Sequence, residues 1–215
     1  MNWLQKLDRK FYRLAVPHLM VILSAAMLGI YLVDLLLPQT NLISLLSLDR
    51  ERIFQGEVWR LVTFIFLPPS SSPLWIVFAL YFNCLIGEGL ENQWGKFKFN
   101  LFYLCGMVGA ILASLITGYG TNEYLNLSLF LAFAAFYPDF QVRLFFLLPV
   151  KIKYLAFLDI LFYLYSLVFG TFASRMALLL SLLNVLLFFG SDLFHHLKQQ
   201  SGYWKTRRNF RKYNR

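Results

Sequence analysis

Two side chains in one apolar stretch of the sequence, Ser128 and Glu123, are of types that could take part in hydrolysis. A serine hydroxyl is a poor nucleophile until a neighbouring base removes its proton, and histidine is a common base. The sequence contains three histidines, His18, His195 and His196. We expect these histidines at the cytoplasmic ends of the first and sixth predicted spans, whereas Ser128 lies toward the outer end of the fourth. The distance along that helix from Ser128 to Pro138, at its cytoplasmic end, is alone about 15 Å. Ser128 and Glu123 are therefore candidates only for a non-standard catalytic site, and we otherwise predict no catalytic residue.

Polar and ionisable residues within the apolar stretches form a second group that could carry a function: Asn83, Glu88, Glu91, Asp159, Ser181 and Asn184. An ionisable group in a membrane is costly and usually faces the protein interior or a cavity. A small transporter or channel is therefore one hypothesis. The sequence lacks the inverted repeats and glycine-broken helix pairs that build a midplane transport site, so this hypothesis is the least favoured. Cys84 and Cys105 lack metal-ligand spacing, and we predict no cofactor and no metal site.

The composition indicates which elements must position these residues. Hydrophobic residues make up 59% of the chain and charged residues 14%, against roughly 25% charged in an average soluble domain. A helix needs about 20 apolar residues to cross the hydrocarbon core. We predict an all-α, polytopic membrane protein, a six-helix bundle with an interfacial first loop. The predicted spans are 17–37, 72–92, 98–119, 122–138, 153–172 and 175–195, and the apolar segment 140–149 is predicted to be an interfacial turn.

The distribution of lysine and arginine indicates the orientation, because these residues accumulate on the cytoplasmic side of short loops. On this basis both termini are cytoplasmic. We divide the chain into an amphipathic basic N-terminus (1–16), the membrane domain (17–196) and a basic cytoplasmic tail (197–215). The first residues do not resemble a cleaved secretory signal. The sequence has no organelle signal or retention motif, which led us to predict the plasma membrane of a bacterial-type cell.

The net charge of +9 does not require a nucleic-acid partner. Basic residues next to the last span follow from the topology, and they also attract anionic lipid headgroups. We predict the lipid bilayer as a partner and no nucleic acid. The sequence does not indicate an oligomeric state.

Small residues recur every four positions in the third predicted span, which contains Gly106, Ala110, Ser114 and Gly118. Residues with this spacing share one helix face. Because helices in lipid cannot use the hydrophobic effect to associate, close approach through small residues matters more than in water. We predict that this face forms a tight seam with another span.

Two motifs, together with the topology, resemble the rhomboid superfamily, which includes rhomboid proteases, derlins and inactive rhomboids. The first motif is Trp59-Arg60, followed by the break 68–72. The second runs from Gly87 through Leu90 and Glu91 to Gly95. The resemblance covers most of residues 20–190. It implies that the Trp59-Arg60 loop lies sideways in the outer leaflet and that Glu91 supports packing on the cytoplasmic side.

These residues also have simpler interpretations. Trp59 and Arg60 could be an interfacial anchor pair, for which aromatic and basic residues are both common. Glu91 could be a solvated helix end paired with Lys96 or Lys98.

The catalytic parts of that family are where this sequence departs from the resemblance. A rhomboid protease has a serine in a Gly-x-Ser-Gly turn at the start of span four and a histidine in span six, and neither motif is present. Trp75 and Ala79 stand where protease members carry the His and Asn that support the oxyanion. Without the histidine base, the Gly-x-Ser-Gly turn and the oxyanion donors, most of the groups that accelerate peptide hydrolysis are missing. The resemblance therefore implies an inactive member of the derlin or inactive-rhomboid type.

Our preferred hypothesis is a pseudoprotease that binds transmembrane segments of client proteins and perturbs the local bilayer. The shortness of the predicted spans motivates this hypothesis, because a span whose hydrophobic length is less than the bilayer thickness is accommodated by local thinning of the bilayer. The alternative is an intramembrane serine protease of the same superfamily with a non-standard site at Ser128 or Glu123. The sequence leaves enzymatic activity open and favours its absence.

Overall fold

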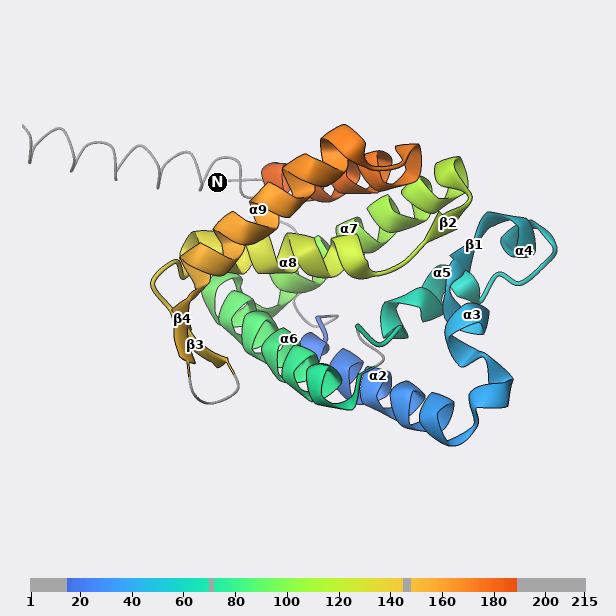
Figure 1. The fold of residues 1–215 in the computed structure, drawn as a ribbon, viewed down its shortest axis with the longest axis horizontal. Helices are drawn as coiled ribbons and strands as arrows, with labels where there is room; N and C mark the ends of the chain where they lie inside the picture. The colour runs from blue at the N-terminus through green and yellow to red at the C-terminus, as the bar shows by residue number, and fades with distance from the viewer. Residues whose placement is uncertain (1–14, 70–71, 145–147, 189–215) are drawn as a thin grey trace, which may run out of the picture.

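The computed structural model describes residues 15–69, 72–144 and 148–188 (Figure 1). The basic N-terminus lies almost entirely outside this range, and the basic tail, His195 and His196 lie wholly outside it. The elements in chain order are α2 (Leu19–Leu36), η2 (Pro38–Thr40), α3 (Leu42–Leu46), β1 (Leu48–Asp49), α4 (Arg50–Phe54), α5 (Arg60–Thr63), η3 (Phe64–Phe66), α6 (Pro73–Trp94), α7 (Lys96–Thr117), β2 (Tyr119–Gly120), α8 (Glu123–Phe136), β3 (Gln141–Leu144), β4 (Leu148–Lys151) and α9 (Ile152–Phe169), followed by a helix at Phe172–Phe188.

The prediction of a helical, multi-pass membrane protein is confirmed. Among the described residues, α2, α6, α7 and α9 are long and apolar enough to cross a membrane. α8 and the helix Phe172–Phe188 are apolar but shorter. The sixth predicted span, 175–195, thus begins earlier than predicted, at Phe172, and its predicted end lies outside the described residues.

Two glycines on α6 let neighbouring helices approach its backbone closely. A Cβ added at Gly87 would overlap the side chain of Met20 on α2. A Cβ added at Gly89 would lie 2.6 Å from the Phe133 ring of α8. Because van der Waals packing at small residues drives much of helix association in lipid, α6 packs against α2 on one side and α8 on the other (Figure 1).

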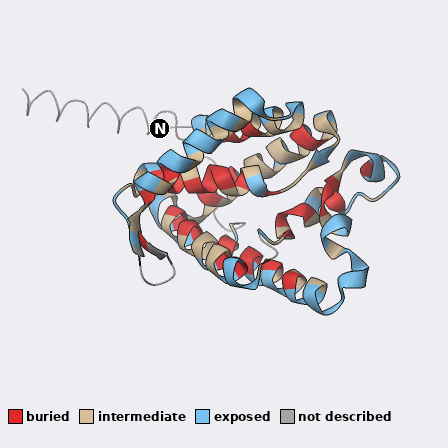
Figure 2. Cartoon of the chain, viewed as in Figure 1, coloured by how far each residue is buried: buried red, intermediate tan, exposed pale blue. Residues whose placement is uncertain are grey.

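The core lies where α6, α7 and α8 face one another. Leu90, Phe99 and Phe102 are fully buried there, and Phe133 is almost fully buried. The Trp94 ring packs edge-on against Phe102, with ring centroids 5.6 Å apart. α9 lies at the outside of the bundle and most of its surface is exposed (Figure 2). These outward apolar side chains are what a helix bundle presents to lipid.

The first loop, residues 37–72 between α2 and α6, folds into short helices and docks onto the turn between α7 and α8. β1 pairs with β2, with Leu48 opposite Gly120. The backbone N–H of Arg50 donates to the carbonyl oxygen of Gly118 at 3.0 Å. A Cβ added at Gly120 would lie 2.9 Å from the Cβ of Ser114, so glycine is needed for this approach. The pairing holds the first loop at the end of the bundle where α8 begins.

The segment 140–149, predicted to be an interfacial turn, includes β3 and the start of β4 among its described residues. β3 pairs antiparallel with β4, and Val142 lies opposite Val150. The segment is too short to cross a membrane as a helix, and strand pairing satisfies its backbone hydrogen-bonding groups. This hairpin and the β1–β2 pair are the departures from the all-helical prediction within the described residues.

The hairpin is tied to the start of α9 by charge. The Asp139 carboxylate accepts hydrogen bonds from the ammonium groups of Lys153 at 2.9 Å and Lys151 at 3.2 Å. These hydrogen bonds, Lys153 first, and the positive charges lower the pKa of Asp139 below its usual value. Since all three side chains are exposed to solvent, these two ion pairs contribute little to the stability of the fold.

Replacing Gly87 with alanine should destabilise the bundle by about 2 kcal/mol, because the new methyl group would overlap Met20 and force α2 and α6 apart. Gly29→Ala on α2 is the matched control, since a Cβ there meets no atom within 4 Å. The free energy of unfolding would be measured by denaturant titration in mixed micelles. Equal stability of the two variants would contradict the close α2–α6 contact.

Candidate functional site

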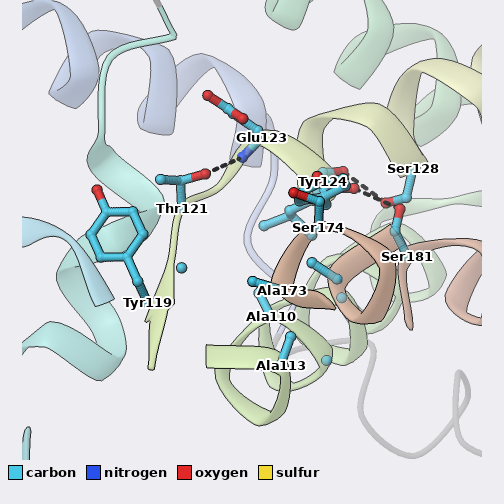
Figure 3. A pocket seen from close by; sticks show the side chains of 15 residues that line it. Ala110, Ala113, Tyr119, Thr121, Glu123, Tyr124, Ser128, Ala173, Ser174 and Ser181 are labelled. Atoms are coloured by element: carbon cyan, nitrogen blue, oxygen red, sulfur yellow. Dashed lines mark hydrogen bonds between the residues drawn. The ribbon is translucent and has the colours of Figure 1, made fainter. Parts of the chain in front are cut away.

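A cavity of about 380 Å³ lies between α7, the start of α8 and the helix Phe172–Phe188 (Figure 3). Small residues of α7, including Gly109 and Ala110, form one wall. The opposite walls carry the hydroxyl groups of Ser128, Ser174 and Ser181. The cavity also adjoins the α7–α8 turn onto which the first loop docks.

The hydroxyls of Ser128 and Ser181 are both committed to the backbone of α8. Ser128 Oγ donates to the carbonyl oxygen of Leu125, and Ser181 Oγ donates to that of Tyr124, each at 2.7 Å. Figure 3 shows these two hydrogen bonds next to each other. Within the described residues neither hydroxyl bonds to an imidazole or a carboxylate. Because a serine without a base is a poor nucleophile, these groups act here as structural donors.

The other residues considered for catalysis are not assembled into a proton-transfer site. Glu123 lines the cavity and is exposed, and its backbone N–H donates to Thr121 Oγ1 at 3.4 Å. His18, the histidine within the described residues, does not line the cavity. Trp75 and Ala79 are also absent from its walls. Among the described residues, the cavity thus combines hydroxyls and one carboxylate without an imidazole.

Some residues of the small-residue face of α7 pack against other elements, and others line the cavity. A Cβ added at Gly106 would overlap Leu125 of α8 and lie 2.9 Å from Asn184 Nδ2. Ala110, one turn later, lines the cavity, and Ser114 packs against the β2 strand. Gly118 lies outside the predicted seam. It ends α7 with a φ of 98°, a conformation that favours glycine, and an added Cβ would meet no atom within 4 Å.

Arg60 is fully buried beneath the first loop and holds the loop together. Its Nε donates to the carboxylate of Glu57, and its Nη1 donates to the carbonyl oxygens of Ser44 and Ser47 at 2.7 and 2.9 Å. The guanidinium thus joins α5 to the end of α3. The interpretation of Arg60 as an exposed interfacial anchor does not fit this burial.

Trp59 points away from this network. It is 47% exposed, and Phe54, Val58 and Val62 beside it are more than half exposed. These four residues form the apolar surface of the first loop. Aromatic residues at such a surface are typical of membrane interfaces.

Glu91 binds the start of α2. Both carboxylate oxygens accept from the backbone N–H of His18, at 3.0 and 3.2 Å, and the residue is 8% exposed. A carboxylate at a helix N-terminus satisfies an otherwise unpaired donor and interacts favourably with the helix dipole. Among the described residues Glu91 forms no ion pair with Lys96 or Lys98, so the solvated-end interpretation does not fit.

The rest of the Gly87–Gly95 motif supports the same junction. Leu90 is fully buried in the core. Gly95 has a φ of 83° in the turn that connects α6 directly to α7. The motif thus packs α6 against α2, caps α2 and reverses the chain within one short segment.

Sequence reasoning missed Asn122. Its side chain is buried and donates to the carbonyl oxygen of Leu67 at 2.9 Å, which ties the first loop to the start of α8. An asparagine immediately before an apolar helix is a usual N-cap signal, but this side chain makes no cap hydrogen bond. Asn184, singled out as an intramembrane polar residue, donates to the carbonyl oxygen of Phe102 on α7 at 3.3 Å.

Residues 20–189 match a family described as "Eukaryotic integral membrane protein (DUF1751)". The match runs from the first turn of α2 past the end of the last described helix, so it includes the first loop and the cavity. No curated protein matches the chain. The prediction of a bacterial-type plasma membrane is wrong, because the family is eukaryotic. The absence of a short targeting motif was too weak a signal to identify the membrane.

Arg60→Gln should lower the free energy of unfolding by about 3 kcal/mol, because it leaves two carbonyl groups and the Glu57 carboxylate without their buried cation. Arg52→Gln is the control: its ion pair with Asp49 is long, 3.7 Å, and exposed, so the loss should be below about 1 kcal/mol. Denaturant titration in mixed micelles measures both. Similar losses for the two variants would contradict the anchoring role of Arg60.

Proposed function

The chain belongs to this family of eukaryotic integral membrane proteins, and from that premise we propose that it is a rhomboid-like protein without proteolytic activity. In this proposal it binds transmembrane segments of client proteins and thins the bilayer around them.

The rhomboid-like assignment is supported by what the two motifs do. Arg60 organises a first loop whose neighbouring Trp59 faces outward. The Gly87–Gly95 motif, near the C-terminal end of α6, packs α6 against α2 and caps the start of α2. These contacts of the loop and of the helix junction support the roles that the resemblance implies.

The observation that carries the proposal is the arrangement of Ser128 and Ser181. An intramembrane serine protease needs a nucleophile and a base between its fourth and sixth spans. Here both hydroxyls are donated to α8 carbonyl oxygens, beside a cavity walled by small residues. Such a site has room for a side chain, and among the described residues no base contacts either hydroxyl.

Bilayer thinning is supported by two features of the fold, the length of α8 and the exposed surface of the first loop. α8 has 14 residues, which at 1.5 Å per residue is about 21 Å, against a hydrocarbon core of about 30 Å. The exposed apolar surface of the first loop, with Phe54 78% exposed, is suited to enter the lipid interface. A short helix and an apolar loop surface suited to the lipid interface both favour a thinner bilayer.

The transporter hypothesis receives no support from the polar residues that suggested it. Glu91, Ser181 and Asn184 are each hydrogen-bonded to backbone groups of a neighbouring helix. Interhelical bonds of this kind stabilise membrane helix packing. They leave these three side chains with structural roles.

Purified protein should not cleave a panel of single-span substrates in liposomes, and a fluorophosphonate probe should not label it. The physical reason is that Ser128 Oγ donates to the carbonyl oxygen of Leu125 and that no base contacts it within the described residues. Ser128→Ala and Glu123→Gln serve as controls, with an active rhomboid protease on the same panel. Cleavage or labelling that disappears in either variant would overturn the proposal in favour of the non-standard protease.

Client binding predicts that photo-crosslinkers on lipid-facing positions of α9 capture single-span proteins within the membrane. Phe157 and Phe162 are suitable positions, since both side chains are well exposed. Capture should exceed that by an unrelated six-span protein several-fold. Capture no greater than this background would refute client binding.

A further inference from the structure

One carboxyl group, Asp159, lies about halfway along α9, a candidate membrane span. It is half-buried, and within the described residues it makes no hydrogen bond or ion pair. A carboxyl group at this depth is costly, and such residues usually face a protein interior or a cavity and pair with an opposite charge. Asp159 therefore lacks the partner that its position calls for.

The surroundings of Asp159 are polar and connect to the cavity. Tyr163, one turn further along α9, packs against the Tyr124 ring of α8, with ring centroids 6.4 Å apart. Asp159 stands one turn before Tyr163 on α9, and Glu123 directly precedes Tyr124 on α8. Tyr124 and Glu123 in turn line the cavity. The ring contact between Tyr124 and Tyr163 thus brings together two helix segments that each carry a carboxyl group.

No basic side chain lines the cavity within the described residues. The basic residues at the ends of α9 are already bound elsewhere. Lys151 and Lys153 bind Asp139 at the start of the helix. Arg175 donates to the carbonyl oxygen of Val168 at 2.7 Å beyond its other end. The negative charge of this face is therefore available to a group from outside the described fold.

We propose that the α8–α9 face selects client transmembrane segments that carry a lysine or arginine near their middle, with Asp159 as the ion-pair partner. This inference rests on the proposed client binding and names the class of client. A basic residue in an isolated span is itself costly, so pairing with Asp159 removes two unfavourable charges from lipid at once. The long side chain of lysine or arginine can reach across the helix contact while its stem packs against apolar residues.

The test uses full-length protein in liposomes and two acceptor-labelled model helices, a leucine–alanine host with or without one central lysine. Energy transfer from donor-labelled protein measures binding. The lysine helix should bind about tenfold more tightly, as expected for an interhelical polar contact in a membrane. Asp159→Asn should reduce its affinity to that of the plain helix. Asp34→Asn, at a half-buried acid on α2, is the matched control and should keep the preference.

The outcomes separate this inference from the proposed function. Binding of both helices without a lysine preference, or a preference that survives Asp159→Asn, overturns the inference and leaves client binding in place. Binding of neither helix overturns both. If Asp159→Asn does not elute as a folded protein, a second model helix with a central aspartate replaces it as the probe. Tight binding of the aspartate helix would then contradict selection by negative charge.

Discussion

Close approach of α2, α6 and α8 is the constraint on which the rest of the structure depends. Gly87 and Gly89 permit it, since a side chain at either position would overlap Met20 or crowd Phe133. The Glu91 carboxylate, one turn after Gly87, then satisfies the backbone N–H of His18 where α2 begins. In lipid, where an unpaired backbone donor has no water to bind, packing and capping must be solved together. The Gly87–Gly95 motif solves both with neighbouring residues of one helix.

The opposite end of the bundle is held by buried polar groups rather than by apolar packing alone. Arg60 gathers backbone carbonyls within the first loop, and Asn122 ties that loop to the start of α8. These bonds are strong because their alternative is an unsatisfied buried group. The outer side of the loop carries the exposed Trp59 next to the buried Arg60. Surface exposure and internal order thus belong to adjacent residues.

The same small residues that allow helices to approach also leave space. Gly106 is in contact with α8 and the last described helix, while Gly109 and Ala110 border the cavity. The hydroxyls around that cavity are bound to the backbone of α8, which suits a site that holds a side chain better than one that reacts with it. Asp159 adds charge to the adjoining face. This chemistry is the basis for proposing binding rather than catalysis.

The sequence by itself determined the helical membrane class, because the length and apolarity of a span are local properties. Arg60, Glu91 and Gly87 stand out in the sequence through the two motifs that resemble the rhomboid superfamily. The partners of these residues were decided only by the tertiary structure. Ser44 with Arg60, His18 with Glu91 and Leu67 with Asn122 are joined through backbone atoms, which every residue possesses. No residue type therefore marks them in the sequence, and only the folded arrangement of the helices brings them together.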